Sequence, residues 1–115
     1  MKSLANMKGR SLLTLHDLSD EEMLGLLDLA DEMKRRRMAR VHGHLLDGKH
    51  IAMIFEKLST RTRCATATAV FDEGGRTEYI GKGETHLGKK ESVKDSARVL
   101  GRMFDFRVLD MFEFG

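Results

Sequence analysis

Hydrophobic residues recur at two spacings along the chain, and the first of these is the spacing of a helix. Ser19 and Glu22 stand three residues apart, as in a capping box at a helix N-terminus. The apolar residues that follow recur every three or four positions: Met23, Leu26, Leu27, Ala30 and Met33. This pattern predicts a helix from about residue 20 to 38. Residues 1–18 are mixed in character, and we interpret them as an extended lead-in.

A short and nearly continuous apolar run occupies residues 50–55, after a glycine-containing loop at 41–49. Such a run suits a strand that is buried on both faces of a parallel sheet. Helical spacing resumes at residues 61–72 and is ended by a pair of glycines at 74–75. The predicted order is therefore strand, polar turn and helix.

The same alternation continues to the end of the chain. Residues 77–80 predict a second strand, and a polar, glycine-rich connection follows at 81–88. A third helix is predicted at about 91–103, with these residues on its apolar side: Val93, Ala97, Leu100 and Phe104. Residues 107–112 predict a third strand. Alternating strands and helices indicate an α/β fold, in which helices flank a parallel sheet in three layers.

The size and composition are those of one globular domain. The 115 residues can bury an ordinary core, so we expect residues 1–115 to form a single domain. The hydrophobic fraction of 41% is too high for a disordered chain. A net charge of +2 lacks the large positive field expected of a nucleic-acid-binding protein. The densest basic cluster, residues 34–40, ends the first predicted helix, where positive charge favours the helix dipole and is expected to be solvated.

Cysteine and histidine usage points away from redox and metal chemistry. Cys64 is the only cysteine, so it cannot form an intramolecular disulfide, and we expect it to pack as a small apolar residue. His42, His44 and His50 have no ligand spacing with acidic or thiol groups, so no metal is expected. The first thirty residues hold no apolar stretch long enough for a signal peptide or a membrane span. We therefore expect a cytoplasmic protein without a membrane partner.

The segment Ser-Thr-Arg-Thr-Arg at 59–63 is the part of the sequence richest in chemistry. It lies between a predicted buried strand and a helix, and ligands of open α/β sheets bind outside the carboxyl ends of the strands. The helix would direct unpaired N–H groups and its positive dipole end at the same point. The hydroxyl groups are further donors, and Arg61 could grip two oxygens of a phosphate or carboxylate.

The same residues also allow a purely structural interpretation. Ser59 or Thr60 could cap the helix without binding a ligand. The arginines could be solvated or paired with one of three carboxylates: Glu56, Asp72 or Glu73. From the residues alone, an anion site and a helix cap both remain open.

Two motifs that occur in order along the chain carry a family resemblance. Residues 55–64 read Phe-Glu-Lys-Leu-Ser-Thr-Arg-Thr-Arg-Cys, and residues 87–95 read Leu-Gly-Lys-Lys-Glu-Ser-Val-Lys-Asp, leading into Ala-Arg-Val-Leu-Gly-Arg-Met at 97–103. The first motif resembles the carbamoyl phosphate motif of the carbamoyltransferases, in the Glu-Lys form typical of the ornithine enzymes. The second is similar to the next helix of that family. The likeness runs from about residue 10 to Asp105 and corresponds to the N-terminal domain of a two-domain family.

The resemblance implies a reaction. The δ-amino group of ornithine would attack the carbamoyl carbon of carbamoyl phosphate, giving citrulline and phosphate in arginine metabolism, with a biosynthetic or a catabolic role left open. It implies no metal and no organic cofactor. In this family the active sites lie between the subunits of a trimer, so the resemblance also implies a homotrimer.

The resemblance further assigns roles to residues. Those implied to hold the phosphate of carbamoyl phosphate are Ser59, Thr60, Arg61 and Thr62. Arg61 would also be catalytic, because it is placed to stabilise charge as the carbamoyl group leaves. His86 falls where ornithine enzymes commonly have a glutamine that contacts carbamoyl phosphate, and it is either a substituted ligand or a solvated loop histidine. Lys57 and Arg63 belong to the motif and are expected to form ion pairs within the domain.

The likeness ends close to Asp105. Residues 98–106 and 107–115 nearly echo each other, and Arg107 comes several positions earlier than the arginine that completes the family's anion site. The family's ornithine-binding segment and its acidic residues have no counterpart in this sequence. We therefore interpret the chain as a truncated carbamoyl phosphate-binding domain that does not complete the reaction alone. The alternatives are a non-catalytic module that associates with full-length subunits, and a relic that does not fold stably.

Overall fold

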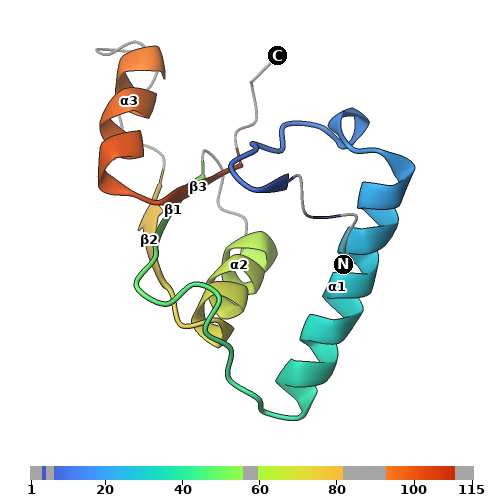
Figure 1. Ribbon diagram of the computed structural model, residues 1–115. Helices are drawn as coiled ribbons and strands as arrows, with labels where there is room; N and C mark the ends of the chain where they lie inside the picture. The colour runs from blue at the N-terminus through green and yellow to red at the C-terminus, as the bar shows by residue number, and fades with distance from the viewer. Residues whose placement is uncertain (1–3, 5–6, 56–59, 82–92, 111–115) are drawn as a thin grey trace. The chain divides into compact units, whose positions relative to one another are not determined.

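The structure is a computed structural model that describes residues 4, 7–55, 60–81 and 93–110 (Figure 1). The chain divides into two compact units, Met1–Val41 and His42–Gly115.

The first unit is built around one long helix, α1 (Asp20–Met38), as the apolar spacing predicts. A 3-10 turn (Leu15–Asp17) precedes it, so the expectation of an extended lead-in is wrong at these residues. The reason is local: the Thr14 hydroxyl accepts a hydrogen bond from the N–H of His16 and caps the turn.

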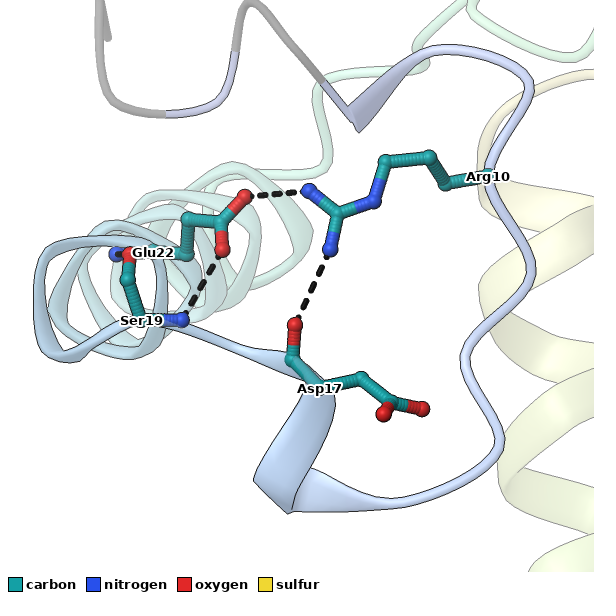
Figure 2. Close-up of polar contacts among 4 residues, drawn as sticks. All are labelled: Arg10, Asp17, Ser19 and Glu22. Atoms are coloured by element: carbon teal, nitrogen blue, oxygen red, sulfur yellow. Dashed lines mark hydrogen bonds and ion pairs between the residues drawn. The ribbon is translucent and has the colours of Figure 1, made fainter.

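The N-terminus of α1 carries the predicted capping box, which Arg10 extends (Figure 2). The Ser19 hydroxyl accepts from the N–H of Glu22 at 3.1 Å, and the Glu22 carboxylate accepts from the N–H of Ser19 at 2.9 Å. Arg10 donates to the other Glu22 oxygen at 2.6 Å and to the carbonyl of Asp17 at 3.0 Å. The hydrogen bond from the Ser19 N–H, and then that from Arg10, lower the pKa of Glu22. A single carboxylate thus joins the helix cap to the segment before it.

The basic end of α1 is solvated, as expected from the charge pattern. Glu32 accepts from Arg35 at 2.6 Å and lies 3.5 Å from the Arg36 guanidinium, and the hydrogen bond from Arg35 lowers the pKa of Glu32. Arg40 has a φ of 56°, a left-handed conformation that favours glycine. With Arg40 in that conformation, the N–H of Val41 reaches the carbonyl of Arg36 at 2.9 Å. This bond closes the last turn of the helix.

The second unit contains a parallel sheet of three described strands, β1 (His50–Phe55), β2 (Arg76–Ile80) and β3 (Phe106–Asp110). Their order is β2-β1-β3, and both pairings of the central strand are parallel (Figure 1). Residues 51–55 of β1 are each no more than 4% exposed. The helices of this unit are α2 (Thr60–Asp72) and α3 (Val93–Met103). The predicted α/β fold is confirmed.

The predicted boundaries hold to within one residue wherever the structure describes them. Strand β3 begins at Phe106 and not at 107, and residues 111–112 lie outside the described residues. Residues 91–92, where the third helix was expected to begin, lie outside them too. So does the glycine-rich connection from residue 82 onward.

The register brings the carboxyl ends of the three strands to one edge of the sheet. Near this edge, Ile54 of β1 is opposite Ile80 of β2, and Phe55 is opposite Asp110 of β3. Four residues, 56–59, separate the end of β1 from Thr60, where α2 begins. The N-terminal turn of α2 therefore follows directly on this edge.

The far end of α2 is fixed by the loop that precedes β1. Within this loop, the N–H of Gly43 donates to the carbonyl of Asp72, and the N–H of Leu46 donates to the carbonyl of Glu73, each at 2.8 Å. Gly74 has a φ of 85°, which ends the helix as the Gly-Gly pair predicts. The C-terminal carbonyls of α2 are thus satisfied, and the helix is anchored away from the candidate site.

The first residue of β1 is tied to the residue before β3. The N–H of His50 donates to the Asp105 carboxylate, and the N–H of Asp105 donates to the carbonyl of His50, each at 2.9 Å. The His50 ring lies 4.6 Å from the Phe104 ring, centroid to centroid. These contacts set the register of β3 against β1 at its start.

Replacing Glu22 will separate the two parts of the α1 cap. Glu22→Gln keeps an oxygen for the Ser19 N–H but removes the charge that faces Arg10, whereas Glu22→Ala removes both. We expect the protection of α1 amides against hydrogen exchange at pH 7 to fall from wild type to E22Q and again to E22A. Because the pKa of Glu22 is lowered on folding, its stabilising effect is present above the ordinary value of 4.5 and is lost as pH falls through the lowered pKa.

The wild type and E22Q should therefore converge in acid. Hydrogen exchange followed from pH 7 downward, corrected for intrinsic exchange rates, measures this convergence. Equal protection of all three proteins at pH 7 would show that the network does not stabilise α1.

Replacing Asp105 will test the bond that starts β3. Asp105→Ala leaves the N–H of His50 without its acceptor and should lower the free energy of unfolding by about 1 kcal/mol. Asp105→Asn retains an oxygen acceptor and should lose less. Urea unfolding followed by far-ultraviolet circular dichroism gives these values. A D105A protein as stable as the wild type would contradict the assignment.

Candidate functional site

The candidate site is the start of α2, which follows the end of β1 at the carboxyl edge of the sheet. In open α/β sheets this edge is where ligands bind. Helix α2 has 13 residues, so the unpaired N–H groups of its first turn and the positive end of its dipole lie at its N-terminus, next to that edge. Backbone geometry alone makes this an attractive position for an anion.

Three of the predicted site residues make up the start of α2. Thr60, Arg61 and Thr62 are consecutive in its first turn, and all three are exposed. The helix therefore brings two hydroxyl groups and one guanidinium group into one turn beside the unpaired N–H groups. Ser59 and His86 lie outside the described residues, so their predicted roles stay predictions.

Two of the carboxylates proposed as partners for the motif arginines lie too far away. Asp72 comes eleven positions after Arg61 in the same helix, which places it about 16 Å further along the axis. Glu73 is occupied at that far end, where its carboxylate accepts from the N–H of Leu45 at 3.4 Å. Glu56, the third candidate, is outside the described residues. Asp72 and Glu73 therefore do not neutralise Arg61.

Among the described residues, the partner of Arg63 is an aromatic ring. Glu56 and Lys57 lie outside the described residues, so the ion pairs expected for Arg63 and Lys57 stay predictions. The Arg63 guanidinium carbon lies 4.0 Å from the centroid of the Tyr79 ring in β2. The Tyr79 ring meets the Phe55 ring edge-on, with centroids 5.8 Å apart and planes 83° apart. The sequence reasoning missed Tyr79. Its signal was the alternation in β2, in which Thr77 and Tyr79 are partly buried and Arg76 and Glu78 are exposed.

Cys64 does not pack as the sequence suggested. It is a free cysteine and is exposed, one residue beyond the first turn of α2. Its position explains this, since every residue of α2 from Thr60 to Ala65 is exposed.

Among the described residues there is neither a metal-binding cluster nor a membrane-spanning helix. Within residues 7–55, 60–81 and 93–110, no group of three or more His, Cys, Asp or Glu side chains is placed to hold a metal ion. No helix in the same part of the chain combines the length and apolar character needed to cross a bilayer.

Comparison with known proteins identifies relatives along most of the chain. Residues 10–113 match the family described as aspartate/ornithine carbamoyltransferase, carbamoyl-P binding domain. The catabolic ornithine carbamoyltransferase of Bacillus licheniformis is 53% identical over 105 residues, which are 91% of this chain and 31% of that protein. The enzyme of the same name from Bacillus cereus is 55% identical over 100 residues, which are 87% of this chain and 30% of that protein.

Solved structures agree with the sequence match. The ornithine carbamoyltransferase of Pyrococcus furiosus superposes with a TM-score of 0.85 at 37% identity, over 90% of this chain and 33% of that one. The catalytic subunit of M. jannaschii aspartate transcarbamoylase gives a TM-score of 0.76 at 33% identity, over 85% of this chain and 32% of that one. The chain spans about a third of the length of the relatives it matches. With its strand-turn-helix site and parallel sheet, this chain belongs to the aspartate/ornithine carbamoyltransferase family and corresponds to its carbamoyl phosphate-binding domain.

Proposed function

We propose that this chain binds carbamoyl phosphate and forms the carbamoyl phosphate-binding part of an ornithine carbamoyltransferase. The observation that carries the proposal is the first turn of α2, where Thr60, Arg61 and Thr62 are exposed at the carboxyl edge of the sheet. Residues 1–115 would act as one carbamoyl phosphate-binding domain, and the family match continues through residue 113, beyond the end at Asp105 that the motifs suggested.

The chemistry of carbamoyl phosphate fits the groups that this turn offers. The phosphate would accept hydrogen bonds from the N–H groups of the first turn and from the hydroxyl groups of Ser59, Thr60 and Thr62. The guanidinium group of Arg61 would hold two phosphate oxygens. His86, as a neutral imidazole, would donate one hydrogen bond to the ligand.

Arg61 would also act in the transfer step. The δ-amino nitrogen of ornithine forms a bond to the carbamoyl carbon, the bond from that carbon to the phosphate oxygen breaks, and the nitrogen loses a proton. Negative charge grows on the leaving phosphate as that bond breaks, and a fixed positive charge beside it stabilises the transition state. Neither a metal nor an organic cofactor is needed, because the domain supplies positioning and electrostatics.

Ornithine is the proposed acceptor for two reasons. The motif at 55–64 has the Glu-Lys form of the ornithine enzymes, and both Bacillus relatives are named ornithine carbamoyltransferases. These relatives are named catabolic, which favours a role in arginine metabolism without fixing its direction. A cytoplasmic homotrimer is proposed with this function, since the family's active sites lie between subunits.

The Arg61→Ala variant tests the phosphate site. Loss of a charged, bidentate donor should weaken carbamoyl phosphate binding by about ten- to a hundredfold, as expected for a hydrogen bond to a charged group. Arg61→Lys keeps the charge without the planar fork and should fall between R61A and the wild type. Calorimetric titration of the purified chain with carbamoyl phosphate, and separately with inorganic phosphate, measures both effects.

Arg76→Ala is the matched control. Arg76 is an exposed arginine at the start of β2, at the opposite edge of the sheet, and its removal should leave the affinity unchanged. Wild-type chain that shows no saturable binding, or an R61A protein that binds like R76A, would refute the site.

Turnover is measured separately from binding. We expect the 115-residue chain to bind carbamoyl phosphate without forming citrulline when ornithine is added, because it spans about a third of the length of its relatives. A colorimetric citrulline assay on the same protein checks this. Citrulline formed in proportion to the chain, and lost in R61A, would show instead that these residues complete the reaction.

A further inference from the structure

Arg63 and Arg61 lie in the same turn of α2 but on opposite sides of it. A helix turns by about 100° per residue, so side chains two positions apart differ by about 200° around the axis. Val70, which is 6% exposed, follows Arg63 by seven positions and therefore lies on the same side as Arg63. Arg63 is exposed, as Arg61 is, but it stands on the side of α2 that carries the buried Val70, whereas Arg61 stands on the opposite side.

On this side of α2, the Arg63 guanidinium contacts the sheet. This group lies 4.0 Å from the centroid of the Tyr79 ring, and the Tyr79 ring packs edge-on against Phe55. Phe55 is the last residue of β1 and is 1% exposed. One contact chain therefore joins the first turn of α2 to the carboxyl ends of both β1 and β2.

The identity of the partner matters for an anion site. A positive charge in the first turn of a helix is repelled by the helix dipole, so Arg63 needs a compensating attraction. A carboxylate would supply it but would cancel the positive charge and repel an anion at the same edge. The face of an aromatic ring attracts the guanidinium group while leaving its charge in place. The stack therefore anchors the turn and keeps its positive potential.

We propose that Arg63 is a positioning residue, which by stacking on Tyr79 fixes the first turn of α2 in the orientation that binds the phosphate of carbamoyl phosphate. The proposal rests on the proposed function, because it concerns the same ligand. Arg63 acts through Thr60, Arg61 and Thr62 and does not itself hold the ligand.

The test compares substitutions that keep the stack with substitutions that remove it. Tyr79→Phe keeps the ring face, and Arg63→Lys keeps the charge. Tyr79→Leu removes the ring at similar volume, and Arg63→Gln removes the charge. In calorimetric titrations with carbamoyl phosphate, Y79F should bind within about twofold of the wild type, whereas Y79L and R63Q should each bind about three- to tenfold more weakly.

A double variant decides whether the two residues act as one unit. If they do, Y79L has no further effect in the R63Q background, and R63Q/Y79L binds like either single variant. If the losses in the double variant multiply, the residues act independently and the proposal is overturned.

Val70→Ala separates positioning from general stability. The substitution loosens the same side of α2 without touching the stack. Its losses of thermal stability and of affinity are therefore the reference against which those of Y79L and R63Q are compared. A purely structural role predicts equal losses of affinity at equal losses of stability, and this result would overturn the proposal.

Tyr79 is the only tyrosine in a chain without tryptophan, so its fluorescence reports on the stack directly. Removing the stack in R63Q should change this signal relative to the wild type.

The remaining outcomes distinguish this proposal from the proposed function. If the wild type binds carbamoyl phosphate and Y79L binds equally well, the positioning role is refuted and the binding function stands. If the wild type fails to bind carbamoyl phosphate, the binding function and the positioning role both fall.

Discussion

Strand β1 is hydrogen-bonded in parallel to β2 on one side and to β3 on the other, and its residues 51–55 are buried on both faces. A strand in this position satisfies its backbone groups only through its two neighbours, so its register fixes theirs. The carboxyl ends of all three strands then fall at one edge. Strand β1 ends at that edge with Phe55, and α2 begins after four intervening residues, at Thr60. The candidate site is therefore a consequence of where β1 stops.

The helix that carries the site is held at both of its ends. At its C-terminus, Gly43 and Leu46 donate to the carbonyls of Asp72 and Glu73, and Gly74 ends the last turn. At its N-terminus, Arg63 lies over Tyr79. A helix held at both ends presents its first-turn N–H groups in a fixed direction. Such preorganisation is what electrostatic binding of an anion needs, because the donors do not have to reorganise when the ligand arrives.

Local features of this fold were predictable from the sequence, and contacts between distant residues were not. The capping box of α1 and the glycine end of α2 follow from neighbouring residues, and both were predicted. The stack of Arg63 on Tyr79 joins residues 16 positions apart, and the bond from His50 to Asp105 joins residues 55 positions apart. Periodicity carries no information about such pairs. Strand-turn-helix order could indicate an anion at Thr60–Thr62, but only the family resemblance indicated carbamoyl phosphate.

The arginines of this chain show how the choice of partner follows from position. Arg10, Arg35 and Arg36 pair with carboxylates, and all three belong to the first unit, where charge neutralisation stabilises a helix end or its cap. Arg63 stands beside the candidate anion site and faces an aromatic ring. Among the described residues the partner of Arg63 is this ring, and the ion pair expected from its charge stays a prediction because Glu56 lies outside them. The surrounding potential matters as well: a carboxylate partner would weaken the anion site, whereas an aromatic partner anchors the arginine and leaves the positive charge that the ligand requires.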